Sequence, residues 1–170
     1  LYYRDDDVYG YASWSYYASA LIPRVNRGDT VSIKNLGIDY AYIAYRHSAS
    51  AFVGFAGSTG VSDTGEPYAN VNIDRCYVGS TVKIVGHDIG AFRGGSRCSN
   101  TTITNSYSLA TLEATEKNNG TGYTYGLLGN MWDSSANISN CYNANGPIAS
   151  ESSAFTRTNC YETERSKYGD

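Results

Sequence analysis

The chain has 170 residues and a formal net charge of −3; 41% of its residues are hydrophobic and 17% are charged. This balance excludes an electrostatic nucleic-acid binder and a basic membrane-surface protein. No apolar run approaches the roughly 20 residues of a membrane-spanning helix, so we expect no membrane insertion. The abundance of Tyr, Gly, Ser, Thr and Asn is typical of secreted β-proteins, so we expect an extracellular or cell-surface location.

Residues 1–29 are rich in tyrosine and match no repeat elsewhere in the chain. We interpret them as an N-terminal cap or as a first irregular coil. Trp14, Tyr16 and Tyr17 are candidate ligand-binding residues, because aromatic faces stack on sugar rings. The alternative is that these rings cover the open end of the fold, where unpaired strand edges would otherwise aggregate.

Two short strings alternate through residues 30–161. The first reads Ile73-Asp-Arg-Cys-Tyr77, Ile103-Thr-Asn-Ser-Tyr107 and Ile138-Ser-Asn-Cys-Tyr142, with a shortened Thr158-Asn-Cys-Tyr161 and a divergent Ile33-Lys-Asn-Leu-Gly37. The second reads Ala51-Phe-Val-Gly54, Ala91-Phe-Arg-Gly94 and Gly126-Leu-Leu-Gly129, and Ser153-Ala-Phe155 resembles a last partial copy. The isoleucine anchors follow Ile33 at intervals of 40, 30 and 35 residues. Such regularity indicates a repeat architecture.

The strings alternate apolar and polar residues with period two, which predicts β-strands. Short strands that recur every 30–40 residues without intervening helices predict an all-β β-solenoid, with equivalent strands stacked about 4.8 Å apart. Ile73, Ile103 and Ile138 then form one apolar column, and Asn105, Asn140 and Asn159 stack through their amides. We expect the last glycine of the second string to supply a turn with positive φ.

Two later segments are less regular. Residues 110–118 are the best helical candidate in the chain, and they fit a strand followed by a turn equally well. Residues 162–170 are predicted to form a polar C-terminal tail.

The four cysteines are predicted to be structural. Cys76, Cys141 and Cys160 hold equivalent repeat positions, which Ser106 also occupies, while Cys98 lies elsewhere in its repeat. Disulfides between stacked neighbours, Cys141 with Cys160 and Cys76 with Cys98, and a stack of reduced thiols both fit this pattern. With two histidines and no Cys-x-x-Cys pair, we expect no structural zinc site, and no other metal or cofactor is predicted.

The alternating strings resemble the GLUG repeat, which combines a Gly-Leu-Val-Gly core with an Asn-Cys-Tyr-Ser string. That repeat occurs in large bacterial surface proteins, including adhesin-like proteins and the non-catalytic part of some bacterial immunoglobulin A proteases. The stretch Ile33-Lys-Asn-Leu-Gly-Ile38 also looks like a coil of a right-handed parallel β-helix. The resemblance implies a module for adhesion, display or spacing, with flanking domains in a longer chain and with a glycan or a host surface protein as partner.

A second aromatic group, Tyr123, Tyr125 and Trp132, brackets the third copy of the second string, and core or turn packing is its alternative role. These rings make a carbohydrate-binding module the second functional hypothesis. The third is a polysaccharide lyase or hydrolase, which would need carboxylates gathered on neighbouring coils. The acidic residues do not recur at equivalent positions, and His87-Asp88 is an adjacent pair without a catalytic motif. We therefore predict no catalytic residues and a non-enzymatic extracellular bacterial module.

Overall fold

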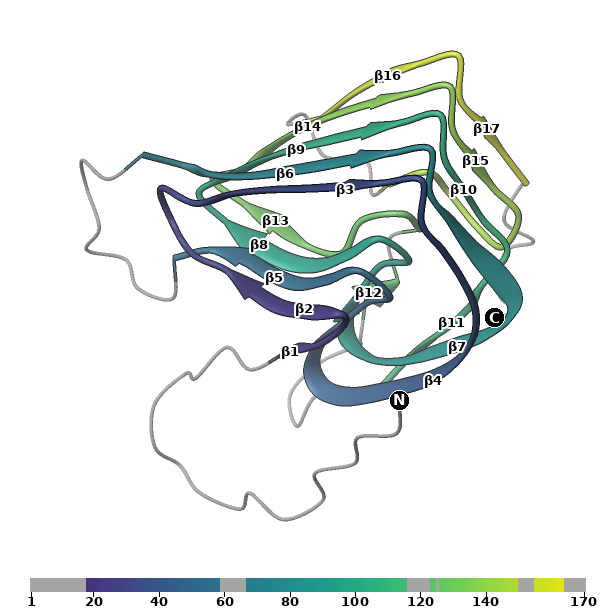
Figure 1. Cartoon of the computed structure of the whole chain (residues 1–170). Coiled ribbons are helices and arrows are strands. Elements are labelled where there is room, and N and C mark those ends of the chain that lie inside the picture. Colours follow the sequence, from purple (N-terminus) through teal and green to yellow (C-terminus); the bar gives the residue numbers. More distant parts are fainter. Residues whose placement is uncertain (1–17, 59–66, 116–122, 125, 150–154, 164–170) are drawn as a thin grey trace.

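The computed structural model describes residues 18–58, 67–115, 123–124, 126–149 and 155–163. Over these ranges the chain forms seventeen strands and no helix, and the strands make three sheets in which every pair is parallel (Figure 1). The all-β class and the parallel pairing predicted from the repeats are confirmed. Within the same ranges, no helix has the length and apolar character of a membrane span.

Sheet C contains the isoleucine of each first string. Its five strands lie in the order β16–β14–β9–β6–β3 and comprise β3 (Thr30–Lys34), β6 (Ala69–Asp74), β9 (Ser99–Thr104), β14 (Ser135–Ser139) and β16 (Phe155–Thr158). Ile33 pairs with Ile73, Ile73 with Ile103, and Ile103 with Ile138. The predicted isoleucine column is therefore confirmed. Burial alternates along β6 and β9, as a sheet with one solvated face requires.

Sheet A follows sheet C in each repeat. Its main path runs β1–β4–β7–β10–β15–β17, and β11 and β12 also pair with β7. The strands are β1 (Ala18–Ser19), β4 (Gly37–Ala49), β7 (Tyr77–Ile89), β10 (Tyr107–Ser108), β11 (Thr111–Ala114), β12 (Tyr123–Thr124), β15 (Tyr142–Asn143) and β17 (Tyr161–Glu162). The segment that fitted either helix or strand thus contains a strand at residues 111–114. Its register against residues 83–86 of β7 gives the backbone partners in the adjacent strand, whereas a helix of so few residues would leave most of its N–H and C=O groups in unpaired end turns.

Sheet B contains the second string. Its strands are β2 (Ile22–Val25), β5 (Val53–Gly57), β8 (Arg93–Arg97) and β13 (Met131–Trp132), in the order β13–β8–β5–β2. The rings of Phe52 and Phe92 stack at 5.3 Å with a 6° interplanar angle. Phe155 does not extend this string, because it lies in β16 of sheet C, paired with Ala136. The last partial copy expected at residues 153–155 is therefore wrong.

The glycines that end the second string serve a different purpose from the one predicted. Positive φ occurs at Gly28, Gly57, Gly126 and Gly146 among the described glycines, so Gly54, Gly94 and Gly129 supply no such turn. A side chain on Gly94 would overlap the carbonyl oxygen of Gly54, and one on Gly129 would overlap the backbone of Gly94. The glycines are needed because successive backbones approach closely at this point.

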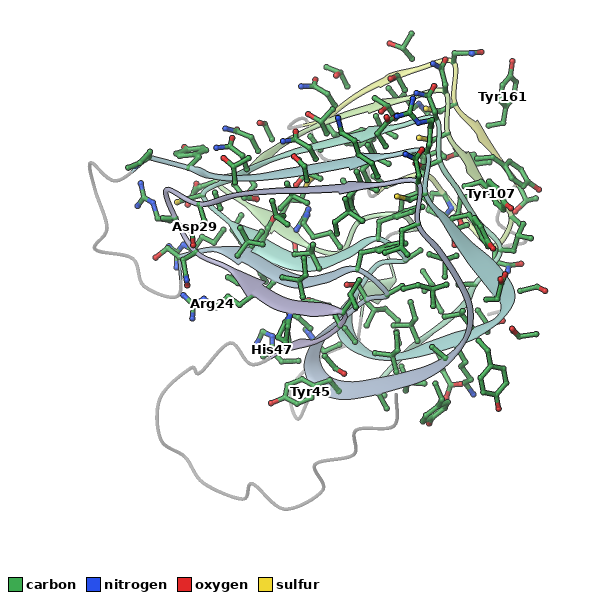
Figure 2. The ribbon with its side chains drawn as sticks, in the orientation of Figure 1. Arg24, Asp29, Tyr45, His47, Tyr107 and Tyr161 are labelled. Atoms are coloured by element: carbon green, nitrogen blue, oxygen red, sulfur yellow. The ribbon has the colours of Figure 1, made fainter. Side chains whose placement is uncertain are left out.

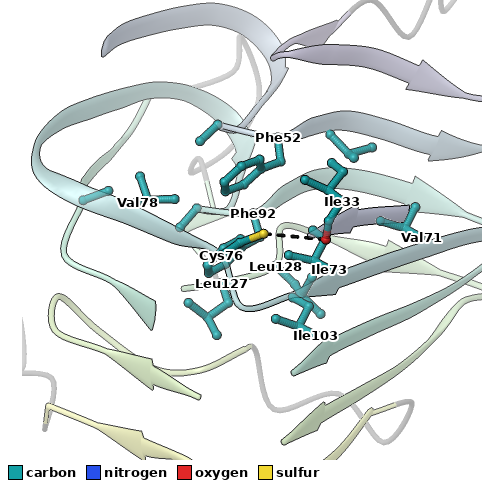
Figure 3. Packing of buried hydrophobic residues seen from close by; sticks show 14 of the residues in the cluster. Ile33, Phe52, Val71, Ile73, Cys76, Val78, Phe92, Ile103, Leu127 and Leu128 are labelled. Carbon is teal, nitrogen blue, oxygen red and sulfur yellow. Dashed lines mark hydrogen bonds between the residues drawn. The ribbon is translucent and has the colours of Figure 1, made fainter. Parts of the chain in front are cut away.

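The core lies between the three sheets. The chain passes from sheet C to sheet A to sheet B in β3–β4–β5 and again in β6–β7–β8, so like side chains face each other in successive repeats. Figure 3 shows Ile33, Ile73 and Ile103 on one side of this interior and Phe52 and Phe92 on the other. Each such side chain, once fully buried, stabilises the fold by about 1.5–3 kcal/mol.

The isoleucine column ends at the last described repeat. Arg157 pairs with Ile138 in the position that isoleucine holds in earlier repeats. Its side chain is exposed and forms a 3.0 Å ion pair with Glu162. The carboxylate of Glu162 also accepts a hydrogen bond of 2.6 Å from the backbone N–H of Ile148. Charged groups therefore lie at this position of the column, where the earlier repeats have an apolar side chain.

Candidate functional site

The turn from sheet C into sheet A has the same length in all five repeats. We call it the C–A corner; it comprises residues 35–36, 75–76, 105–106, 140–141 and 159–160. The first residue of each pair has a positive φ between 51° and 55°, and four of the five are asparagines. Asparagine tolerates this left-handed conformation better than most residues. A constant two-residue turn therefore holds every repeat in the same register.

The asparagine side chains at this corner form a ladder. The amide nitrogen of Asn159 donates to the side-chain oxygen of Asn140 at 2.8 Å, and that of Asn140 donates to Asn105 at 3.0 Å. The amide of Asn105 in turn donates to the carboxylate of Asp74 at 2.9 Å. The predicted stacking of Asn105, Asn140 and Asn159 is confirmed. We call these three residues the amide column.

The ladder continues towards the first repeat through charged groups. The hydrogen bond from Asn105 is the main reason that the pKa of Asp74 is lowered, and a second hydrogen bond from Thr104 adds to it. Arg75 forms a 3.0 Å ion pair with Asp74 and donates a 2.8 Å hydrogen bond to the side-chain oxygen of Asn35. The positive charges of Arg75 and, to a smaller extent, Lys34 also lower the pKa of Asp74.

A tyrosine begins the sheet A strand after four of these corners. Tyr77 pairs with Tyr107, Tyr107 with Tyr142, and Tyr142 with Tyr161, which places the four rings in one column. We call these four residues the tyrosine column. The rings of Tyr77 and Tyr107 stack at 5.3 Å and 8°. Exposure of the side chain is 41% at Tyr107, 38% at Tyr142 and 66% at Tyr161. Figure 2 shows Tyr107 and Tyr161 along one edge of the molecule.

The first repeat has glycine where the others have tyrosine. Gly37 pairs with Tyr77, and a side chain on Gly37 would overlap the Tyr77 ring. The Tyr77 hydroxyl donates a 2.8 Å hydrogen bond to the carboxylate of Asp39. This hydrogen bond and the negative charge of Asp39 raise the pKa of Tyr77. The tyrosine column is therefore anchored at its first ring by Asp39, and the hydroxyl of Tyr161 donates a 3.2 Å hydrogen bond to the side-chain oxygen of Asn159.

The inward side of the C–A corner contains the cysteines. Cys76, Ser106, Cys141 and Cys160 precede the four paired tyrosines, so their predicted equivalence is confirmed. The Cys76 thiol points to the Ile33 carbonyl oxygen at 3.6 Å, as Figure 3 shows, and the Cys141 thiol lies 3.1 Å from the Ser139 carbonyl. Burial raises the pKa of Cys141 to about 11.

All four thiols are free in this structure. Cys98 lies at the start of β9, where Ser99 pairs with Ala69, whereas Cys76 follows the end of β6. The six residues of β6 therefore separate the two cysteines, a distance of about 20 Å. This is far beyond the 4.4–6.8 Å between Cα atoms in a disulfide, so the predicted option of a Cys76–Cys98 bond is wrong.

A second group of polar residues lies where sheet A turns into sheet B. The Nδ1 atom of His87 lies 3.0 Å from one carboxylate oxygen of Asp88, and Nδ1 of His47 lies 3.7 Å from the other. Asp88 is buried and the two imidazole rings are 6.1 Å apart. The sequence offered only the adjacent pair His87-Asp88; the pairing of β4 with β7 adds His47 from the preceding repeat.

Arg93 is the most unusual side chain of this second region. It pairs with Val53 and Leu128, so it occupies an apolar position, and it is fully buried. Nη1 donates to the Gly94 carbonyl at 3.0 Å, whereas Nε and Nη2 have no hydrogen-bond partner among the described residues. Burial lowers the pKa of Arg93 to about 9.

The aromatic residues singled out from the sequence give a mixed result. Trp14, Tyr16, Tyr17 and Tyr125 lie outside the described residues, and Tyr123 is placed in β12 by its backbone alone. Trp132 lies in β13 of sheet B, 39% exposed, and is not part of the tyrosine column. Sequence reasoning missed Tyr77, Tyr107, Tyr142 and Tyr161 as surface residues. The signal was present, because each first string from residue 73 onwards ends in tyrosine.

The described carboxylates are distributed over different elements and engage local partners. Glu113 pairs with Lys83 at 2.6 Å, and Asp133 lies 3.9 Å from Arg97. Among the described side chains, no group of three or more His, Cys, Asp or Glu residues is arranged to hold a metal ion. Comparison with protein-family models, curated proteins and solved structures finds no match for this chain.

Proposed function

We propose that this chain is a β-solenoid of the right-handed parallel β-helix type that serves as a non-enzymatic extracellular module of a bacterial surface protein. Its role would be adhesion, display or spacing. The observation that carries the proposal is the register of like residues in successive repeats. Isoleucines, asparagines and tyrosines each pair with their own kind along one direction of the molecule.

Such stacking suits a mechanical role. Each repeat contacts only its neighbours, so a rod lengthens by adding repeats without altering those already present. The core columns give the rod stiffness, because close-packed interiors resist compression. The outward columns meanwhile present the same groups at each repeat, which is the property that a display or adhesion surface needs.

The repeated strings supply independent support. Their order and their similarity to the GLUG repeat of bacterial surface proteins suggest the same kind of host protein. The polar outer face of sheet C agrees with exposure to water, since its outward positions are Ser, Thr and Asn in most repeats.

Antibodies against the chain test the location. Labelling of intact source cells is the expected result, with permeabilised cells as the reference for total protein. Labelling that appears only after permeabilisation would contradict an extracellular role.

The adhesive role is tested with beads that carry the purified chain. We expect such beads to be retained on the surfaces that the source cells colonise, in preference to beads carrying albumin. Equal retention of the two kinds of bead would contradict adhesion and leave display or spacing as the role.

A further inference from the structure

The amide column and the tyrosine column form two parallel rows on the outside of the C–A corner. We propose that these rows bind a neutral polysaccharide chain laid along the direction in which the repeats stack. This inference rests on the proposed function and names the ligand that the adhesive surface would recognise.

The first argument is unused hydrogen-bonding capacity. An asparagine amide has two donor hydrogens and two acceptor lone pairs. In the ladder, Asn140 uses one hydrogen towards Asn105 and one lone pair towards Asn159. A spare donor and a spare acceptor therefore remain on an exposed side chain. Such a pair matches sugar hydroxyls, which both donate and accept.

The second argument comes from the tyrosine hydroxyls. Tyr107 and Tyr142 are substantially exposed, and their hydroxyls have no hydrogen-bond partner among the described residues. The Tyr107 ring stacks on the Tyr77 ring at 5.3 Å, and Tyr142 pairs with Tyr107 in the next repeat, so the two exposed tyrosines belong to one column. Tyr161 is 66% exposed, and because its hydroxyl donates a 3.2 Å hydrogen bond to the side-chain oxygen of Asn159, it offers its aromatic ring rather than a free donor. Aromatic rings with a polar tip suit ligands that combine apolar faces with hydroxyls.

The third argument is periodicity. The corner presents one amide and one phenol in each of three successive repeats, at residues 105–107, 140–142 and 159–161. Neighbouring strands lie about 4.8 Å apart, so the groups recur at a regular, short interval. A polymer of identical units engages such a surface at several points at once, which raises its avidity without any single strong contact.

Charge favours a neutral polymer. Over these three repeats the two columns contain only amides and phenols. Asp74 and Arg75 form an ion pair at 3.0 Å beside the first of these repeats, Arg157 and Glu162 form another at 3.0 Å beside the last, and Lys34 adds one positive charge near Asp74. An acidic polysaccharide would therefore meet cations that are mostly paired with carboxylates, whereas a neutral chain meets groups whose desolvation costs little because they exchange hydrogen bonds with its hydroxyls.

The test is affinity electrophoresis of the purified chain in gels containing a neutral mannan, a neutral glucan or acidic polygalacturonate. We expect retardation by at least one neutral polymer and none by polygalacturonate. Tyr142→Ala should weaken binding about tenfold, which corresponds to the loss of about 1.4 kcal/mol. Trp132→Ala is the matched control, because its exposed fraction is 39% against 38% for Tyr142, and we expect it to bind like the native chain.

The double variant Tyr107→Phe/Tyr142→Phe keeps the stack and removes only the hydroxyls. It should fold normally and bind more weakly, which covers the case that Tyr142→Ala does not fold. Absence of binding to both neutral polymers, binding to polygalacturonate alone, or loss of binding in Trp132→Ala but not in the tyrosine variants would each overturn the inference. Bead adhesion that persists without polysaccharide binding would overturn it too, while leaving the proposed function in place.

Discussion

Two corners of the repeat, C–A and A–B, differ in what they bury. At the C–A corner the polar side chains face water, and each amide bonds to its equivalent in the next repeat. The A–B corner, residues 50–52, 90–92 and 126–127, is buried throughout. It adjoins buried Asp88 and His87 and is followed by buried Arg93. One corner is a repeated surface, and the other is a packed interior with charged groups in it.

The difference teaches where repetition is favoured. A side-chain ladder favours the same residue in successive repeats, because each side chain completes the hydrogen bonds of its neighbour. Where Arg75 replaces asparagine, the amide of Asn105 donates to Asp74 instead.

A buried corner requires only that the side chains fill the available volume. The position of Phe52 and Phe92 is therefore occupied by Leu127 in the next repeat, and the adjacent position holds Val53 in one repeat and Arg93 in the next. Substitutions at the two corners should therefore fail in different ways.

The largest expected difference is between two glycines. Gly90→Ala would bring a methyl group onto the backbone of Arg93, Leu128 and Gly129, so we expect a loss of about 3 kcal/mol. Gly37→Ala meets the far end of the Tyr77 side chain, which can move aside at the expense of its hydrogen bond to Asp39, so the loss should be smaller, about 1 kcal/mol. Urea unfolding of both variants gives the comparison. Equal losses would mean that the two corners are equally tight.

Arg93→Met should stabilise the protein. The substitution removes two buried nitrogens without partners and keeps most of the side-chain volume between Val53 and Leu128. We expect a gain of about 1–2 kcal/mol in the free energy of unfolding. Chemical denaturation of the variant measures it. A loss of stability would show instead that the Arg93 guanidinium makes a favourable contact in the folded chain.

Two substitutions at Asn140 distinguish the contribution of the backbone conformation to stability from that of the ladder hydrogen bonds. Asn140→Ala loses both ladder hydrogen bonds and places alanine at a φ of 52°, so we expect a loss of about 2 kcal/mol. Asn140→Gly keeps the conformation and loses only the ladder, for a loss of about 1 kcal/mol. Thermal unfolding of the pair checks the order. If glycine is as destabilising as alanine, left-handed strain contributes nothing at this corner.

Thiol reactivity distinguishes the inward side of the C–A corner from the rest of the repeat. With its pKa raised to about 11, Cys141 carries little thiolate at pH 8, and it is buried. Cys98 lies partly exposed at the start of β9. Alkylation with iodoacetamide, followed by peptide mass spectrometry, should modify Cys98 well before Cys141. The reverse order would mean that the C–A corner opens readily.

The smallest effect concerns the first ring of the tyrosine column. Because the folded chain raises the pKa of Tyr77, the unfolded chain loses this proton first, and stability falls as the pH rises through 10. Asp39→Asn removes the negative charge and should return the pKa of Tyr77 towards its ordinary value. Because the chain has 17 tyrosines, nuclear magnetic resonance titration of tyrosine-labelled native chain and variant, with the Tyr77 signal assigned by Tyr77→Phe, measures the shift. An unchanged pKa of Tyr77 in the variant would show that Asp39 does not cause the shift.

The C–A corner was largely predictable from sequence and the A–B corner was not. The recurring Ile, Asn and Cys positions predicted the register of Ile73, Ile103 and Ile138, because aligning the copies of the first string places these three residues in one column. The contact between His47 and Asp88 was hidden, because it depends on register shifts within β4 and β7 that no repeated string records. The burial of Arg93 was equally hidden, because an arginine in a strand is ordinarily read as a solvent-facing residue.

The exposed Arg157, which pairs with Ile138, affects whether a strand from another chain can add to sheet C. A parallel sheet with an open edge invites another chain to add its own strand, which is how fibrils begin. A strand laid on β16 would have to bury the Arg157 guanidinium, together with its 3.0 Å partner Glu162, in place of an isoleucine. Arg157 thereby makes β16 a poorer template for an added strand than the strands of sheet C that have isoleucine at this position, at the cost of one apolar contact.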